Sequence, residues 1–130
     1  MFIIPIIGEA HAGRAFDFIP IRGWRTLYRP IKGVPYDAQL TAWLISGESM
    51  SGDRIHDGDY VIVHMTHDIP PNKILLLQTP DGMTVKRLEP DPEQENGVLL
   101  KSSNPTFEDI PWLAAEVTTI GVVKRVERDF

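Results

Sequence analysis

The sequence predicts a mainly β fold, and three features of the chain indicate it. Eleven prolines and ten glycines divide the 130 residues into short segments. β-branched and aromatic residues dominate the segments between them, as is typical of strands. No long segment keeps the period of an amphipathic helix. We therefore expect short strands joined by turns.

The N-terminal part is expected to contain two strands and a connector. Residues 2–7 are apolar around Pro5, and we predict an edge strand because proline donates no ladder hydrogen bond. Residues 16–21 form the second expected strand. The segment 23–36, rich in Gly, Pro and Arg, is interpreted as a connector between an N-terminal arm and the main body.

The main body contains the other expected elements. Its predicted strands cover residues 39–46, 60–64, 73–78, 83–89, 98–101 and 117–127, and a helical turn is expected at 112–116. Residues 79–82 have the proline and Asp-Gly chemistry of a tight reversal, which predicts a hairpin. Lys86 then lies mid-strand, on one face with Thr84 and Leu88, where it can be partly buried.

Composition narrows the class of protein. The length fits one domain, and a chain without cysteine can form no disulfide and no thiolate metal site, which fits a reducing cytoplasm. The longest apolar runs are far shorter than the roughly 20 residues of a membrane-spanning helix. The net charge of -5 argues against independent binding to DNA.

Ser49 is the candidate nucleophile. It follows an expected strand within Gly47-Glu48-Ser49-Met50, so it would lie on a turn whose backbone amides can face a substrate oxygen. A serine needs a neighbouring base, and Lys86 could serve if burial lowers its pKa. On the residues alone, a solvated lysine at position 86 is the more common situation.

Histidine is the alternative base. A Ser-His-Asp arrangement could combine Ser49 with His56 or His64, and with Asp57 or Asp59, although the chain lacks the G-x-S-x-G elbow. The pair His64 and His67 lacks a convincing third ligand, so we expect no metal.

Three spaced motifs together resemble the catalytic domain of LexA repressors and UmuD-type mutagenesis proteins. These are Gly47-Glu48-Ser49-Met50, the Asp57-Gly58-Asp59 turn before the apolar run 60–63, and Thr84-Val85-Lys86. The resemblance covers nearly all of residues 45–130 and implies a LexA/signal-peptidase-like β fold of short twisted strands, with an N-terminal arm that carries a cleavage site. It divides the chain into an arm, 1–35, and a Ser-Lys catalytic and dimerisation domain, 36–130, within one structural unit.

The resemblance also implies the site. Ser49 would be the nucleophile, Lys86 the base, and the backbone amides of Glu48 and Ser49 the oxyanion donors. Residues 4–13 look like the segment where these proteins cut themselves, with the scissile bond between Ala12 and Gly13. His11 and Arg14 depart from the best-known members, which bears on the cleavage rate and the choice of bond.

The implied partners are a second copy of the chain, bound through the region 117–127, and a RecA filament that promotes cleavage. DNA would be bound only through an N-terminal helix-turn-helix domain that this sequence lacks, so we expect a UmuD-like protein or the C-terminal half of a repressor. Two rivals remain: a non-enzymatic dimerisation module, against which the Ser49 and Lys86 pair argues, and a type I signal peptidase, against which the missing anchor argues.

Overall fold

The computed structural model describes residues 2–10, 23–27, 31–35 and 37–129. The described elements, in chain order, are β1 (Phe2–Ala10), β2 (Gly23–Leu27), β3 (Leu40–Ile45), the 3-10 turn η1 (Ser51–Asp53), β4 (Tyr60–Met65), β5 (Leu75–Thr79), β6 (Gly82–Pro90), β7 (Gly97–Lys101), β8 (Ile110–Leu113), the 3-10 turn η2 (Ala114–Glu116) and β9 (Thr118–Glu127). Within these residues no helix is long and apolar enough to span a membrane.

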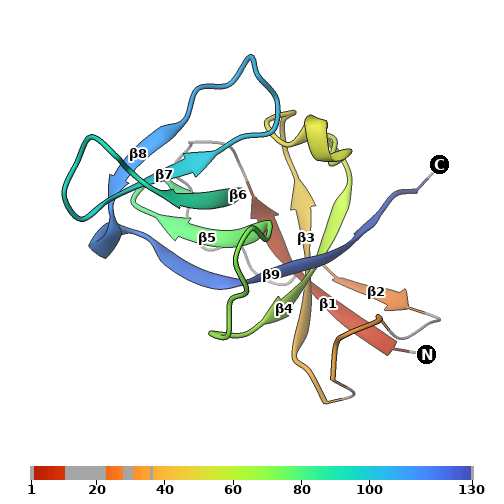
Figure 1. Cartoon of the computed structure of the whole chain (residues 1–130). Coiled ribbons are helices and arrows are strands. Elements are labelled where there is room, and N and C mark those ends of the chain that lie inside the picture. Colours follow the sequence, from red (N-terminus) through yellow and green to blue (C-terminus); the bar gives the residue numbers. More distant parts are fainter. Residues whose placement is uncertain (1, 11–22, 28–30, 36, 130) are drawn as a thin grey trace.

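The strands form one continuous hydrogen-bonded sheet in the order β2-β1-β3-β4-β9-β5-β6-β7-β8. Neighbouring strands are antiparallel except β1 and β3, which run parallel. In Figure 1, β1 to β4 occupy one half of the molecule, β6 to β8 occupy the other, and β9 runs across both. The predicted mainly β fold is confirmed.

Most strands of the main body lie where the sequence predicts them. The hairpin of β5 and β6 is confirmed, with Thr79 opposite Gly82 at its turn. The predicted turn at 112–116 is confirmed only as η2, because its first two residues belong to β8, opposite Gly97 and Val98 of β7. The expected strand 16–21 lies outside the described residues.

The prediction that the N-terminal strand forms a sheet edge is wrong. β1 has a neighbour on each side, and β2, which lies within the predicted connector, covers its outer side. Proline is accommodated because the register with β3 begins only at Ile6, so Pro5 faces Trp24 of β2 and has no partner in β3. The proposed division at residue 35 stays a prediction, although β1 and β2 belong to the same sheet as the rest.

The C-terminal strand is not an edge either. We expected the region 117–127 to pair with a second copy through an exposed edge, but β9 lies between β4 and β5, so this expectation is wrong for the strand as a whole. Its last three residues, from Arg125 to Glu127, are in register with β4 alone among the described strands.

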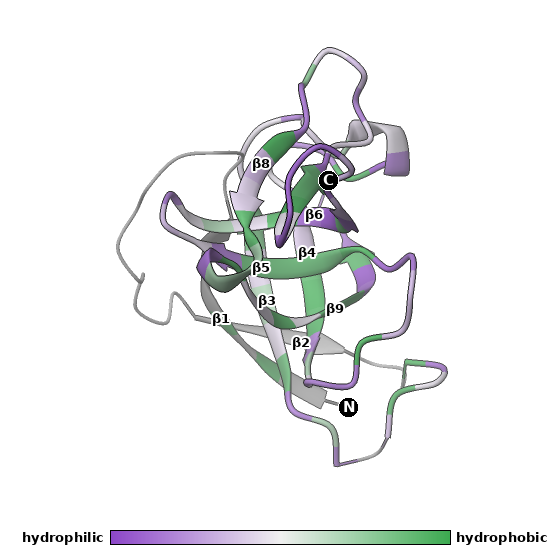
Figure 2. Cartoon of the chain, turned by 60° about the vertical axis from the view of Figure 1, so that its left-hand side comes forward, coloured by the Kyte–Doolittle hydropathy of each residue, from purple (hydrophilic) through white to green (hydrophobic). Residues whose placement is uncertain are grey.

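Three groups of buried side chains form the core. Figure 2 shows hydrophobic residues in β4, β5 and β9 and hydrophilic residues in the loops. One group fills the space between β3, β4, β5, β6 and the 50–55 turn, namely Trp43, Ile45, Met50, Ile55, Val61, Val63, Leu76, Met83 and Val85. The others are Ile4, Ile6, Ile31, Ala42 and Ile62, and Leu75, Leu77, Leu100 and Val122. Met50 and Ile55 thus anchor the turn that carries Ser49 (residues 46–55, the serine turn) to the core.

Candidate active site

Ser49 lies on the turn that follows β3. Two hydrogen bonds, to Asp57 and from Gly58, fix the start of this turn. Gly47 has a φ of +92°, a conformation that favours glycine, and its N–H donates to Asp57 Oδ1 at 2.8 Å. Gly58 N–H donates to the Ile45 carbonyl at 2.9 Å. The Asp57-Gly58-Asp59 turn therefore holds the start of the serine turn in place.

Lys86 lies in the middle of β6 and its side chain is buried against that turn. It is 1% exposed and Ser49 is 6% exposed. The Lys86 Nζ atom lies 2.8 Å from Ser49 Oγ, within hydrogen-bonding distance, although 37 residues separate the two. The structure brings together the two residues on which the sequence hypothesis depends.

Two further acceptors surround the amine. Lys86 Nζ donates to Thr84 Oγ1 at 2.9 Å and to the Val85 carbonyl at 3.2 Å. A neutral amine has two N–H groups and one lone pair, so these two acceptors leave the lone pair for Ser49. This arrangement can take a proton from the serine hydroxyl.

Burial also changes the acidity of the amine. Desolvation lowers the pKa of Lys86 from 10.5 to about 8. Burial disfavours the charged ammonium, and among the described residues no carboxylate contacts Nζ to oppose this effect. A useful fraction of the amine is therefore neutral near neutral pH.

The histidine alternative receives no support from the contacts. His56 Nδ1 lies 3.0 Å from Glu48 Oε2, whereas the hydrogen-bond partner of the Ser49 hydroxyl is Lys86. The Asp59 carboxylate accepts two hydrogen bonds from Arg128, at 2.7 Å each, which lower its pKa. Asp57 accepts a hydrogen bond from the Gly47 N–H, and within the described residues no imidazole is hydrogen-bonded to the Ser49 hydroxyl.

The loop after β7 supports the serine turn, which the sequence analysis did not anticipate. The N–H groups of Ser103 and Asn104 donate to the Ser49 carbonyl at 3.1 and 3.0 Å, and Asn104 Nδ2 donates to the Glu48 carbonyl at 3.0 Å. Their only sequence signal is a polar Ser-Ser-Asn-Pro run directly after a strand. Among the described residues, the N–H groups of Glu48 and Ser49 donate to no protein acceptor.

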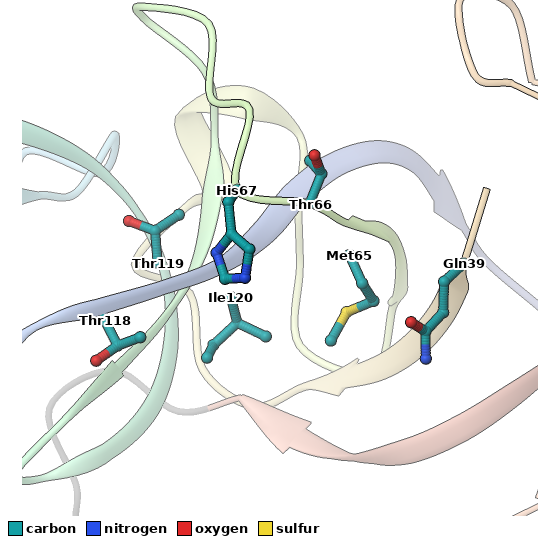
Figure 3. Close-up of a pocket in the computed structure, with 7 residues that line it drawn as sticks. All are labelled: Gln39, Met65, Thr66, His67, Thr118, Thr119 and Ile120. Carbon is teal, nitrogen blue, oxygen red and sulfur yellow. The ribbon is translucent and has the colours of Figure 1, made fainter.

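A surface pocket lies away from this site. It has a volume of about 410 Å³. Figure 3 shows the His67 ring directed toward Ile120 within it, with Met65 to one side. The lining residues are Gln39, Met65, Thr66, His67, Thr118, Thr119 and Ile120. Among the described histidines His67 alone lines it, and the described part of the chain contains no cluster of metal-ligating side chains.

The predicted cleavage site, Ala12 and Gly13, lies outside the described residues, as do His11 and Arg14. The last described residue before it is Ala10, at the end of β1. Ala10 is in parallel register with Ile45, the last residue of β3. Both strands therefore run toward the end of the sheet where the serine turn begins.

A mainly β domain in which a serine hydroxyl contacts a buried lysine amine matches the class of Ser-Lys peptidases. Comparison with known proteins agrees with this class: residues 5–124 match the model of the Peptidase S24-like family. The chain belongs to this family, as a LexA/UmuD-type S24 peptidase domain.

Its relatives include LexA repressors. The LexA repressor of Vibrio vulnificus (strain YJ016) is 32% identical over 129 residues, which cover 95% of this chain and 55% of the repressor. The LexA repressor of Myxococcus xanthus (strain DK1622) is 27% identical over 132 residues, which cover 97% of this chain and 56% of the repressor. The chain thus spans about half the length of the curated relatives it matches.

Proposed function

We propose that this chain is the self-cleaving serine endopeptidase domain of a LexA/UmuD-type regulator of the response to DNA damage. Ser49 is the nucleophile, Lys86 is the base, and the Ala12–Gly13 bond is the substrate. The observation that carries the proposal is the 2.8 Å contact between a serine hydroxyl and a lysine amine that is 1% exposed. A buried lysine whose described contacts include no carboxylate is better suited to base catalysis than to stabilising the fold.

The proposed reaction begins when neutral Lys86 takes the Ser49 proton. The serine oxygen attacks the Ala12 carbonyl carbon, and the backbone N–H groups of Glu48 and Ser49 stabilise the oxyanion. The ammonium of Lys86 then returns its proton to the Gly13 nitrogen as the peptide bond breaks and an ester forms on Ser49. Water hydrolyses this ester and restores the hydroxyl.

The direction of β1 supports cleavage within one chain. Only one residue separates Ala10 from Ala12 in the sequence, so the proposed scissile bond follows closely after β1 along the chain. Ala10 itself pairs with Ile45, four positions before Ser49. A tethered bond needs no diffusional encounter, only a shift of the arm into the site.

The rate of cleavage should follow the neutral fraction of Lys86. With a pKa of about 8, this fraction rises from about a tenth at pH 7 to about nine tenths at pH 9. We expect the first-order rate to rise about tenfold over this range and to level off above it, as measured by intact mass over time. A rate that stays flat from pH 7 to 10, or that keeps rising tenfold per pH unit, would contradict Lys86 as the base.

Removal of the Thr84 hydroxyl should misdirect the amine. Thr84→Val keeps the shape of the side chain but removes the acceptor 2.9 Å from Lys86 Nζ, so we expect self-cleavage to slow about tenfold at a pH where Lys86 is neutral. Thr41→Val is the matched control, because Thr41 is similarly buried but accepts a hydrogen bond from Trp43 Nε1 instead of Lys86 Nζ. It should lower the unfolding temperature and leave the cleavage rate of the folded protein unchanged.

The assembly and partners are also part of the proposal. By resemblance, the domain forms a homodimer in the cytoplasm, a RecA filament promotes its cleavage, and DNA is bound through a separate helix-turn-helix domain. The last three residues of β9 are in register with β4 alone among the described strands, which is consistent with a partner at that side. A chain that stays intact at alkaline pH while forming dimers would favour the non-enzymatic dimerisation module instead.

A further inference from the structure

β6, the strand that carries Lys86, changes its paired strand directly after this residue. Lys86 is paired with Leu75 of β5, whereas the next residue, Arg87, is paired with Lys101 of β7. Figure 1 shows β6 leaving β5 to join β7 and β8. Lys86 therefore lies where β6 passes from one part of the sheet to the other. The distance between Ser49 and Lys86 depends on how the serine turn is held at this point.

Arg87 makes a two-point contact with the serine turn. Its Nη1 and Nη2 atoms donate to Asp53 Oδ2 and Oδ1 at 2.6 and 3.0 Å, which is the bidentate geometry that fixes orientation as well as distance. Asp53 ends η1, four residues after Ser49. The hydrogen bond from Arg87 lowers the pKa of Asp53, so the pair stays charged over the pH range of the proposed reaction.

The same short turn packs closely on the loop after β7. Asp53 N–H donates to Ser103 Oγ at 3.1 Å, and a Cβ atom at Gly52 would collide with the Ser103 carbonyl oxygen. The Ser103 N–H in turn donates to the Ser49 carbonyl. The serine turn is thus tied to β6 by the Arg87 side chain and to the loop after β7 by hydrogen bonds with Ser103.

We propose that Asp53 and Arg87 form a positioning pair that sets the separation of Ser49 Oγ and Lys86 Nζ. This inference rests on the proposed function. Neither residue contacts the reacting atoms: Arg87 is the chain neighbour of the base, Asp53 belongs to the turn of the nucleophile, and their contact joins the two. The guanidinium and carboxylate side chains are 35% and 24% exposed, so the pair orients the site more than it stabilises the fold.

The test compares the plateau rate of self-cleavage near pH 10, where Lys86 is neutral in every variant. Asp53→Asn and Arg87→Met should each slow cleavage by about tenfold or more, because a displacement of about 1 Å can cost a hundredfold. The double variant should be no slower than the slower single variant, since both lose one contact. The pH midpoint of the rate should stay near that of the wild type, because Lys86 remains buried.

A matched control separates positioning from loss of an ion pair. Lys101 Nζ and Asp109 Oδ2 form a contact of 2.6 Å in which neither residue belongs to the serine turn or to β6. Asp109→Asn should cleave within about twofold of the wild type, as expected of an exposed pair. Circular dichroism at the assay pH gives the folded fraction by which each rate is divided. Rates of Asp53→Asn and Arg87→Met equal to the wild type, or losses explained entirely by unfolding, would overturn the positioning role.

A second readout distinguishes failure of this inference from failure of self-cleavage. A fluorophosphonate reagent labels an activated serine without any movement of the arm, and the rate of Ser49 labelling should fall in the two variants as cleavage does. A wild-type chain that is labelled but stays intact would refute self-cleavage, and labelling would then decide the positioning role alone. A wild-type chain that is neither labelled nor cleaved would refute both.

Discussion

The Ser49→Ala variant should remain an intact chain of 130 residues under conditions in which the wild type yields pieces of 12 and 118 residues. The hydroxyl oxygen is the atom that attacks, and loss of a catalytic serine typically costs at least about ten-thousand-fold in rate. Intact mass after incubation at alkaline pH measures the outcome directly. The stability should change by about 1 kcal/mol or less, since a single hydrogen bond is lost.

Ser51→Ala is the control for this experiment. Ser51 lies two residues further along the same turn, where its backbone N–H donates to the Glu48 carbonyl. The substitution keeps that backbone contact, so cleavage should proceed at the wild-type rate. Cleavage of the Ser49→Ala chain between Ala12 and Gly13 would show that another group is the nucleophile.

The Lys86→Met variant should be equally inactive, because the linear apolar side chain offers no lone pair to the serine proton. We expect a loss similar to that of the serine variant, since nucleophile and base act as a unit. Lys73→Met removes an exposed lysine and serves as the control for the change in net charge. A Lys86→Met chain that cleaves itself at the wild-type rate would exclude Lys86 as the base.

The same substitution should raise the stability at neutral pH. In the folded protein the pKa of Lys86 is about 8, below its ordinary value of 10.5, so the folded state disfavours the charged form. The cost is therefore present in full below about pH 8 and disappears as the pH rises toward 10.5, with an order of magnitude of about 3 kcal/mol. Lys86→Met avoids it, less the loss of the contacts to Thr84 and Val85.

Thermal unfolding of both proteins checks this expectation. The unfolding temperature of Lys86→Met should exceed that of the wild type at pH 7, and the difference should shrink at pH 10. A difference that is the same at both pH values would show that the buried amine carries no charge penalty.

The part of the fold that depends on local pattern could be predicted from the sequence. Alternating β-branched residues and the Asp-Gly turn were enough to find β3 to β7 and the hairpin. β2 and β8 were missed because each is short and contains a strand breaker, Gly23 and Pro111, that only pairing with a neighbour overcomes. Pairing between distant strands, such as β1 with β3, leaves no local signal in the sequence. Pro5 by itself therefore predicts a sheet edge that the fold does not have.

The two catalytic candidates could be predicted from the sequence, whereas the ion pairs around them could not. The resemblance led to Ser49 and Lys86, and strand alternation placed Thr84 beside the lysine. The contacts of Asp53 with Arg87 and of Asp59 with Arg128 span 34 and 69 residues. Charged residues at such separations have many potential partners in a sequence, and only the folded chain shows which pairs form.

The titration of the Lys86 amine tests the central claim most directly. In a chain labelled with ¹³C at lysine Cε, the Lys86 resonance can be assigned by its absence from the Lys86→Met spectrum and followed by NMR from pH 6 to 11. A midpoint of about 8 that coincides with the midpoint of the cleavage rate is the predicted result. A Lys86 resonance that titrates with the exposed lysines near pH 10.5, or a cleavage midpoint that does not follow it, would contradict a buried lysine base for Ser49.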